Sequence, residues 1–485
     1  MTVVVMKFGG SCLVDNNAFK QIDKITNIYS DAKKVYVASA FKGITDLLIA
    51  TANSIDEPHK INENMALIEK RHMNVIQNIF QRGSDYYEAA MEWVDEKLSE
   101  LEEAFSDIEE FGLEPYYKDY VSSFGEILST YILNQYLLSR GHNSIFISAN
   151  NLIITDDNFN NAYPLYELTN NRVEKRILPL LENPKKDTIS CVTGYIGRNK
   201  IGYITTLGRG GSDYTATILA RALYERGSDK DIKVILWKDV DGLLAIDPQY
   251  VPEAALIKRI DYAEAKEIAN FGAQVLHPKC LEAIEKKRIA LEIRNFDQPE
   301  EEENYTVISD STDISQIKGV SALEDASIIT ITSGSMVGVP GILARIFKVM
   351  GEKNISVSLV SQSSSEVSTS FIVSREDLDL AMKSLRETFR DFLELEFFEI
   401  NSKNVGVLNI TGLKVLDNST RSRIFEALDK NGIEVKALSQ SYDELNLSLV
   451  IEDQKLKRAI KTIHDDLCHD IDNFQCADTL RKRKG

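Results

Sequence analysis

The chain opens with an unbroken apolar run. Residues 2–6 do not alternate between apolar and polar positions, which is typical of a strand covered by helices on both faces. A helical pattern follows at Phe19, Ile22 and Ile25, and a second apolar strand is expected at 35–38. This alternation of strand and helix predicts a mostly parallel open sheet sandwiched by helices. We therefore expect an α/β domain that binds its ligands at the carboxyl ends of the strands.

Helix-forming residues dominate the next part of the chain. From 61 to 111 the only glycine is Gly83, which predicts a helical insertion that covers the site. The Ser-Phe-Gly-Glu motif at 123–126 is expected to open a further helix, with Glu126 in its first turn. An acidic residue is favoured there by the helix dipole alone, so the position by itself leaves a functional role for Glu126 open.

The pattern changes after an acidic stretch. Residues 298–304 read Gln-Pro-Glu-Glu-Glu-Glu-Asn, a composition typical of a solvated linker. Two approximate repeats follow, each with the order β-α-β-β-α-β of a ferredoxin-like unit. The expected divisions are a catalytic domain at 1–297, an acidic linker at 298–325, the two repeats at 326–401 and 402–477, and a basic tail at 478–485.

Two glycine clusters carry the candidate chemistry. Residues 205–216 read TTLGRGGSDYTA and predict a strand, an anion-binding turn and a helix N-terminus, with Arg209, Ser212 and Asp213 in or beside the turn. Alone, the pattern also fits a glycine-rich surface loop. The second cluster, KFGGS at 7–11, ends the first strand with Lys7 at the ligand-binding edge. Neither cluster has Walker or dinucleotide-binding spacing, so the phosphate site must be of another kind.

Composition narrows the class of protein. A chain of 485 residues suggests about three domains, and 43% hydrophobic with 27% charged residues is typical of a globular protein. The net charge of −18 argues against nucleic acid as a partner. No apolar stretch predicts a membrane span. The first lysine follows the apolar run, whereas in a signal peptide it would precede it. The odd number of cysteines, five, is typical of a reducing cytoplasm.

One group near the end of the chain contains metal-binding residue types. It consists of His464, Cys468, His469 and Cys476. Their spacing matches no standard zinc pattern, so an ordinary helix end is the preferred interpretation.

Taken in order, the motifs resemble those of the aspartate kinase family. The resemblance covers essentially the whole chain, and the two repeats resemble its regulatory ACT domains. The motifs that carry it are KFGGS at 7–11, VASA at 37–40, GIT at 43–45, SFGE at 123–126, ITDD at 154–157, TGYIG at 193–197, TTLGRGGSDYTA at 205–216, DVDG at 239–242, DP at 247–248 and FGAQVLHP at 271–278.

The resemblance implies transfer of the ATP γ-phosphoryl group to the β-carboxylate of L-aspartate. This reaction would give 4-phospho-L-aspartate, the first intermediate on the way to lysine, threonine and methionine. A carboxylate is already ionised at neutral pH, so the nucleophile needs no general base. The difficulty is to bring two anions together, which makes positioning and cations the expected means of catalysis. Mg²⁺ is expected with ATP, held by phosphates and water, with no protein ligand assigned.

The same resemblance assigns roles to individual residues. The catalytic pair would be Lys7 and Asp213. The substrate-binding residues would be Ser39, Thr45, Glu126, Arg209 and Ser212. The ATP-binding residues would be Lys7, Gly9, Gly10, Gly210, Gly211, Lys238, Asp239, Leu244, Gln249, Gln274 and Val275.

The nucleotide side departs from the family pattern. Leu244 and Gln249 stand where tyrosine and arginine are common, and Gln274 stands where a phosphate-neutralising lysine is frequent, although some plant-type members share these changes. Lys238, in place of the usual threonine, is either the substitute cation or a solvated lysine at a strand end. The departures motivate one alternative, an amino-acid sensor with a weakened kinase domain. A kinase of glutamate or acetylglutamate fits less well, because it would not be expected to combine GRGGSD with two ACT-like repeats.

The regulatory half contains a candidate effector pocket. A turn at 335–341 opens a helix whose N-terminus suits a carboxylate, although a plain turn with an edge strand is also compatible. The residues assigned to it are Met336, Gly338, Gly341, Ile342, Leu343, Asn354, Ser358 and Gln362. Threonine and lysine remain the two candidate inhibitors. Pairing of the ACT repeats predicts a homodimer or homotetramer.

Overall fold

The computed structural model divides the chain into two compact units. The first contains Met1–Leu243, Lys258–Tyr262 and Gln274–Ser311, and the second contains Leu244–Ile257, Ala263–Ala273 and Thr312–Gly485. The structure describes residues 2–183, 187–227, 231–252, 254–270, 275–310, 317–333, 341–365, 367–412, 415, 417–440 and 445–468. No helix in these ranges is long and apolar enough to cross a membrane.

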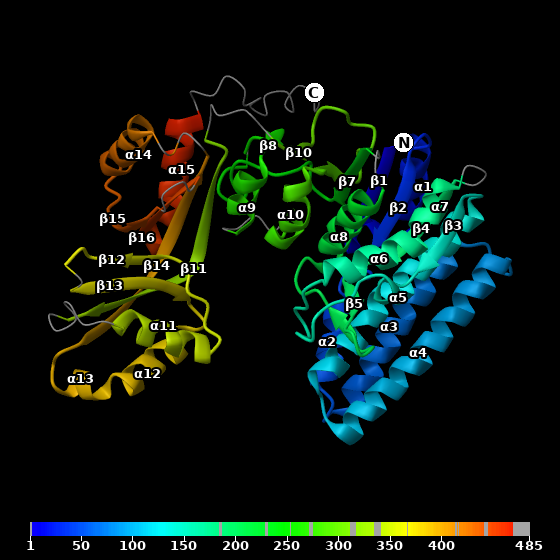
Figure 1. Cartoon of the computed structure of the whole chain (residues 1–485), viewed down its shortest axis with the longest axis horizontal. Coiled ribbons are helices and arrows are strands. Elements are labelled where there is room, and N and C mark those ends of the chain that lie inside the picture. The colour runs from blue at the N-terminus through cyan, green and yellow to red at the C-terminus, as the bar shows by residue number, and fades with distance from the viewer. Residues whose placement is uncertain are drawn as a thin grey trace. The chain divides into compact units, whose positions relative to one another are not determined.

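The first unit is built on an eight-stranded sheet (Figure 1). Its order is β3-β4-β2-β1-β7-β9-β10-β8, and every pair is parallel except β9 with β10. The strands are β1 (Thr2–Phe8), β2 (Lys33–Ala38), β3 (Asn143–Ile147), β4 (Thr188–Thr193), β7 (Asp231–Lys238), β8 (Arg259–Ile260), β9 (Ala290–Asn295) and β10 (Thr306–Ile308). The expected open, mostly parallel sheet is confirmed, with β1 in its interior.

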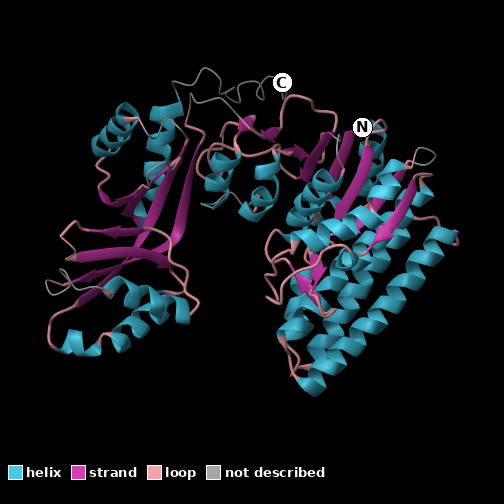
Figure 2. Ribbon diagram, in the orientation of Figure 1, coloured by secondary structure: helices cyan, strands magenta, loops and turns pink. Residues whose placement is uncertain are grey.

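Helices surround this sheet (Figure 2). They are α1 (Asn16–Ile28), α2 (Ile44–Asn53), α3 (Pro58–Ile79), α4 (Asp85–Phe111), α5 (Pro115–Ser139), α6 (Tyr166–Arg176), α7 (Leu178–Glu182), α8 (Gly211–Arg226) and α10 (Pro278–Ile284). Helix α9 (Tyr262–Asn270) spans the division between the units, and short 3-10 turns occur at η1 (Gly10–Leu13), η2 (Ala149–Asn151) and η3 (Glu285–Lys287). The long α3 and α4 confirm the helical insertion and pack with α5 on the core around β1 and β2.

One predicted helix start is wrong. The Ser-Phe-Gly-Glu motif lies in the middle of α5, which begins at Pro115, so Glu126 is not in a first turn. The motif has no N-cap role because residues 115–122 before it are already helical, and its own residues are buried. Gly125 lets α5 approach the β2–α2 turn, since a Cβ at this position would stand 2.8 Å from the Cβ of Ala40.

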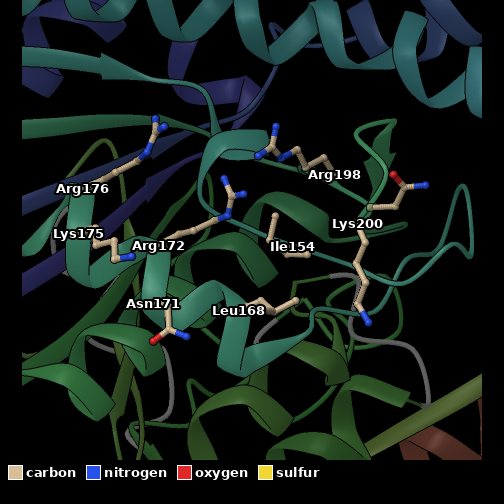
Figure 3. A pocket seen from close by; sticks show the side chains of 9 residues that line it. Ile154, Leu168, Asn171, Arg172, Lys175, Arg176, Arg198 and Lys200 are labelled. Atoms are coloured by element: carbon tan, nitrogen blue, oxygen red, sulfur yellow. The ribbon is translucent and has the colours of Figure 1, made fainter.

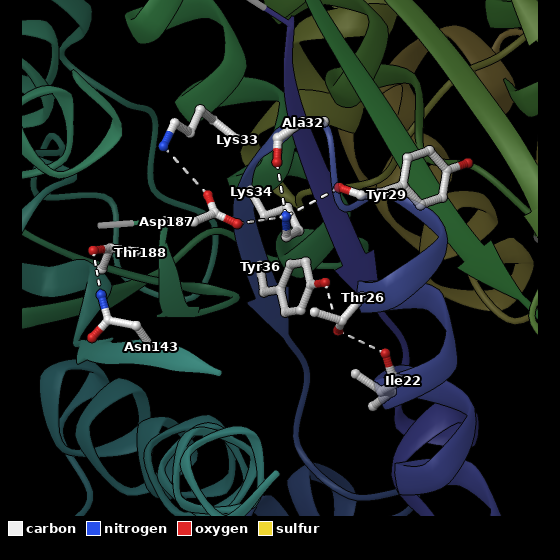
Figure 4. Close-up of polar contacts among 10 residues, drawn as sticks. All are labelled: Ile22, Thr26, Tyr29, Ala32, Lys33, Lys34, Tyr36, Asn143, Asp187 and Thr188. Carbon is white, nitrogen blue, oxygen red and sulfur yellow. Dashed lines mark hydrogen bonds and ion pairs between the residues drawn. The ribbon is translucent and has the colours of Figure 1, made fainter. Parts of the chain in front are cut away.

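At the amino-terminal ends of the strands, a buried lysine joins two connections (Figure 4). The Lys34 ammonium donates to the carbonyls of Ala32 (2.8 Å) and Tyr29 (3.1 Å) and to Asp187 (3.0 Å). Only 2% of the Lys34 side chain is exposed, whereas Lys33, which also pairs with Asp187, is 20% exposed. Lys34 therefore ties the α1–β2 turn to the residue before β4.

The second unit contains one six-stranded antiparallel sheet with the order β12-β13-β11-β14-β16-β15. The strands are β11 (Gly319–Thr332), β12 (Val360–Gln362), β13 (Ser368–Ser374), β14 (Glu399–Thr411), β15 (Val435–Ser439) and β16 (Asn446–Glu452). The helices are α11 (Ile342–Glu352), α12 (Leu378–Thr388), α13 (Arg390–Glu394), α14 (Asn418–Lys430) and α15 (Leu456–Cys468), with a 3-10 turn at η6 (Asp453–Lys455). The two ferredoxin-like repeats are thus fused through their long strands.

The long strand β11 serves both repeats. Its pairing with β14 shifts register between Leu323 and Ala326. Ile329 lies in the core of the first repeat, whereas Val320 lies in the core of the second. The range 298–325, expected to be a linker, therefore includes β10 and the start of β11, while the domain boundaries themselves remain a prediction. A final strand of the second repeat would fall beyond residue 468, outside the described residues.

We predict that Lys34→Met lowers the free energy of unfolding of the first unit by about 1–3 kcal/mol, because two carbonyls lose their donor while the apolar stem is kept. Both tryptophans of the chain, Trp93 and Trp237, lie in this unit, so urea unfolding followed by tryptophan fluorescence reports on it alone. The control is Lys33→Met, expected to change stability by less than about 0.5 kcal/mol. Equal losses in both variants would contradict the role given to Lys34.

Candidate active site

A carboxylate bridges two lysines at the centre of the first unit. Asp213 lies in the first turn of α8, while Lys7 and Lys238 lie at the carboxyl ends of the neighbouring strands β1 and β7. The Asp213 oxygens lie 2.6 Å from the Lys7 Nζ and 2.7 Å from the Lys238 Nζ. The exposed fractions of the side chains are 5% for Asp213, 8% for Lys7 and 17% for Lys238. The lysines and carboxylate thus form a compact, nearly buried cluster.

The cluster carries an excess of positive charge. Burial opposes ionisation of Asp213, but Lys238 and Lys7 outweigh it and lower the pKa of this carboxyl to about 2. Burial lowers the pKa of Lys7, against the attraction of Asp213. For Lys238 the attraction of Asp213 outweighs burial and raises the pKa. With one anion between two cations, the cluster can accept further negative charge such as phosphate oxygens.

The predicted turn before α8 is confirmed. Strand β6 (Ile204–Thr206), which pairs with β5 (Ile196–Arg198), leads into it, and α8 begins at Gly211. Gly210 has φ 69°, and a Cβ there would lie 2.5 Å from the Cβ of His277, so a larger residue is excluded on two counts. The Gly211 N–H donates to the Gly208 carbonyl (3.0 Å). This turn places Ser212, 8% exposed, beside the end of β4.

The turn after β1 meets the turn after β2. A Cβ at Gly10 would lie 2.8 Å from the Ala40 carbonyl, so the two backbones approach as closely as glycine permits. Gly9 faces the Lys7 ammonium, which would be 3.4 Å from a Cβ at this position. The backbone at 9–10 therefore lines the cationic cluster, as expected for residues that approach a phosphate group.

Glu126 enters this region from α5. Its side chain is buried and accepts a hydrogen bond from the Ala40 N–H, while Oε2 has no partner among the described residues. Burial raises the pKa of Glu126 to about 8, against the Ala40 hydrogen bond and the attraction of Lys7. The Ser129 hydroxyl, one turn later, donates to the Ser39 carbonyl (2.7 Å). A buried carboxylate with a free oxygen can accept a ligand ammonium group.

The remaining predicted residues are only partly brought together. Ser39 and Thr45 are half-buried at the β2–α2 turn and the start of α2, and Arg209 and Asp239 are exposed in turns after β6 and β7. Val275 is half-buried, and Gln274 lies outside the described residues. Leu244 and Gln249 belong to the second unit.

The predicted effector residues belong to the second unit. Gly341 is the N-cap of α11, Ile342 and Leu343 are in its first turn, and Asn354, with φ 55°, follows the helix. The Ser358 N–H donates to the Ile372 carbonyl (3.0 Å), and Gln362 is on the edge strand β12. The predicted helix start is thus confirmed, while Met336 and Gly338 lie outside the described residues.

Sequence reasoning missed Asp119. This buried carboxylate on α5 accepts the N–H of Asn160 (2.9 Å) and both the N–H (2.8 Å) and the hydroxyl (2.7 Å) of Thr206. It therefore fixes the loop after the ITDD motif, at Asn160, and the entry to the glycine turn. The sequence signal that could have identified Asp119 is its position seven residues before Glu126, since this spacing puts both acids on one face of a helix. His277 was also missed; burial lowers its pKa, and it packs on Gly210.

Comparison with known proteins supports a single family. A model described as the amino acid kinase family matches residues 2–295, and an ACT domain model matches 329–389 and 417–467. Aspartokinase 3, chloroplastic, of Arabidopsis thaliana is 31% identical, over 95% of this chain and 80% of its own length, and Aspartokinase 2, chloroplastic, is 30% identical over 95% and 83%. The bifunctional aspartokinase/homoserine dehydrogenase of Buchnera aphidicola is 29% identical, but the chain spans only 56% of it.

Solved structures agree over nearly the whole chain. E. coli aspartokinase III in complex with aspartate and ADP has a TM-score of 0.79 at 25% identity, covering 96% of this chain and 100% of that one. The same enzyme in complex with lysine and aspartate has a TM-score of 0.77 at 25% identity, with 96% and 99% covered. Since the kinase model spans more than half of the chain and the full-length aspartokinases align along nearly all of it, the chain belongs to the amino acid kinase family, as an aspartate kinase with C-terminal ACT domains.

Proposed function

We propose that this enzyme transfers the γ-phosphoryl group of ATP to the β-carboxylate of L-aspartate, giving ADP and 4-phospho-L-aspartate. The observation that carries the proposal is the bridge from Asp213 to Lys7 and Lys238 at the ends of adjacent strands. The similarity to an enzyme that binds aspartate and ADP supports the choice of reactants. The product would enter the pathway to lysine, threonine and methionine.

The cationic cluster lowers the electrostatic barrier of the reaction. Both reactants are anions, and the aspartate β-carboxylate needs no deprotonation at neutral pH. Lys7 neutralises charge on the transferring phosphoryl group. Lys238 supplies a second positive charge in place of the lysine that is frequent in the family at the position of Gln274. Asp213 holds both ammonium groups in place before substrates arrive, so little reorganisation is needed during transfer. Catalysis then comes from positioning and charge rather than from proton transfer.

Glu126 and Arg209 recognise aspartate. The free Oε2 of buried Glu126 receives the substrate ammonium, and Arg209 offers a planar fork for a carboxylate. Ser39, Thr45 and Ser212 supply hydroxyl groups. The ammonium stabilises the ionised form of Glu126, so aspartate binding releases a proton from this residue at neutral pH.

The nucleotide lies over the glycine turns. Backbone at Gly9, Gly10, Gly210 and Gly211 approaches the phosphates, and the other nucleotide contacts are Asp239, Leu244, Gln249, Gln274 and Val275. Mg²⁺ bound with ATP would neutralise part of the phosphate charge. Both oxygens of Asp213 already contact lysine. Phosphates and water would hold the ion, and no protein ligand is assigned.

The ACT repeats confer feedback inhibition by threonine or lysine. The proposed pocket is formed by Met336, Gly338, Gly341, Ile342, Leu343, Asn354, Ser358 and Gln362. E. coli aspartokinase III binds lysine, which supports an amino-acid effector without choosing between the two. We propose a homodimer or homotetramer through the ACT repeats, in the cytoplasm. The alternative, a weakened sensor, is motivated by Leu244, Gln249 and Gln274.

The first test is ADP release with magnesium, ATP and L-aspartate. Wild-type protein is expected to turn over aspartate but not glutamate. Asp213→Asn is expected to lower kcat about 10²–10³-fold, since it releases both lysines, and Lys238→Met is expected to raise the KM for ATP. Lys233→Met, on the same strand, is the matched control and should leave both constants unchanged. Absence of turnover, with threonine or lysine still raising the Tm, would favour the sensor instead.

The pKa of Glu126 predicts a pH effect on aspartate binding. Since Glu126 is protonated below about pH 8 in the free enzyme, the KM for aspartate should fall as the pH rises from 6.5 to 8.5. The free energy of unfolding should also fall as the pH rises from about 4.5 to 8, because a carboxyl whose pKa is raised above its unfolded value of 4.5 favours the folded state only while it is protonated there. Glu126→Gln should abolish both trends. A pH-independent KM in wild type would contradict the assignment.

The effector pocket is tested with Asn354→Gly. Glycine tolerates the left-handed backbone of this residue while removing the amide, so the fold should be kept. We expect at least about a tenfold rise in the inhibitory concentration of threonine or lysine with unchanged KM for aspartate, since a lost polar contact costs about 1–3 kcal/mol. Asn431→Gly, after the corresponding helix of the second repeat, is the control. Equal desensitisation in both variants would contradict a specific role for Asn354.

A further inference from the structure

A second cationic site lies in the first unit, in a hollow between α6 and the β5–β6 hairpin (Figure 3). The hollow has a volume of about 440 Å³, within the range of small-molecule sites. Five of its lining side chains are cations: Arg172, Lys175, Arg176, Arg198 and Lys200. Its other lining residues are Ile154, Leu168, Asn171 and Asn199, so no carboxylate is among them.

These cations have no acidic partner in the described part of the chain. Arg172 donates one hydrogen bond, to the Asn151 carbonyl (3.2 Å), and none of the five forms an ion pair there. Figure 3 shows Arg172 and Arg198 reaching toward each other from the two walls. Burial, together with Arg198 and Arg176, lowers the pKa of Arg172. The protein thus concentrates mutually repelling charges in a half-open space without neutralising them.

The arrangement is specific to one face of α6. The acids of this helix, Glu167 and Glu174, both lie by Arg226, at 2.5 and 3.7 Å. In a chain with 74 acidic and 56 basic residues, a five-cation hollow lined by no acid runs against the overall charge. The residues that line the hollow therefore leave its cations available to an anionic ligand.

We propose that this hollow binds a small polyanion with two or more phosphate groups. Guanidinium groups bind phosphate oxygens through paired hydrogen bonds, and the hollow offers three guanidinium and two ammonium groups from two walls. The apolar side chains of Ile154 and Leu168 provide room for a small organic part of the ligand. A single phosphate would engage only some of these cations and should bind more weakly.

The hollow is connected to the catalytic turn through the backbone. Arg198 donates its N–H to the Ile153 carbonyl (3.0 Å) and accepts the Thr155 N–H (2.8 Å). The Thr155 hydroxyl hydrogen bonds to that of Thr205 on β6, which leads into the glycine turn. Polyanion binding should therefore hold this hairpin in place and lower the KM for aspartate. This consequence rests on the proposed function, whereas binding itself does not.

Binding is tested by calorimetric titration of the full chain with inorganic tripolyphosphate, pyrophosphate and phosphate, without nucleotide or magnesium. The double substitution Lys175→Glu/Arg176→Glu is expected to weaken tripolyphosphate binding at this site at least tenfold. The matched control is Lys70→Glu/Arg71→Glu, an exposed Lys-Arg pair on α3 that changes the net charge equally. Because both doubles leave Lys7 and Lys238 intact, any binding at the catalytic cluster is common to all three proteins.

Arg198→Gln, on the opposite wall, should also weaken tripolyphosphate binding, and it keeps the proposal testable if the α6 variant does not fold. Similar losses in the α6 and α3 doubles would show nonspecific charge attraction and overturn the site. Unchanged binding in the α6 double or in Arg198→Gln would overturn it as well. If inorganic phosphate binds as tightly as tripolyphosphate, the proposal that the ligand is a polyanion would be contradicted. If the wild-type protein binds tripolyphosphate at this site but its KM for aspartate does not change when tripolyphosphate is added, only the connection to the catalytic turn would be overturned.

Discussion

The bridge between one buried carboxylate and two lysines, one buried and one half-buried, is the interaction on which the catalytic unit depends. Removing charged groups from water is costly, and Asp213, whose oxygens lie 2.6 Å from the Lys7 Nζ and 2.7 Å from the Lys238 Nζ, offsets that cost. The bridge in turn requires β1 and β7 to be neighbours and α8 to begin beside their ends. The N-terminus of α8 adds a favourable field for Asp213. The order of the strands in the sheet therefore determines which charged groups meet in the site.

Other buried polar groups in the first unit fix its connections in a similar way. Asp119 accepts hydrogen bonds from Asn160 in a loop and from Thr206 at the end of β6, and holds both segments against α5. Lys34 does the same at the opposite ends of the strands, where its ammonium serves two carbonyls and one carboxylate. The Asp119 contacts hold the strand that leads into the glycine turn before α8, which gives that turn the rigidity that positioning of anionic reactants requires.

The sequence predicted the features that local patterns encode, and failed where a distant contact decides the outcome. The strand ends at Lys7 and Lys238 and the turn before α8 follow from apolar runs and glycine spacing, and both are confirmed. Glu126 was misplaced because the Ser-Phe-Gly-Glu motif was expected to open a helix, whereas α5 begins at Pro115 and Gly125 allows close packing against Ala40. The two halves of β11 could not be divided from sequence either, since only pairing with β14 and the two cores separates them.

The two cationic sites of the first unit differ in a way that follows from their burial. In the catalytic cluster, nearly complete burial would make two unpaired ammonium groups too costly, so a carboxylate is retained between them and one net positive charge remains. The hollow beside α6 is half-open, and water screens its five charges enough for them to persist without any acid. A polyanion that enters there meets cations that no carboxylate of the described chain has already engaged. Burial thus requires a carboxylate beside the two catalytic lysines, whereas partial exposure leaves the five cations of the hollow without one and available to a ligand.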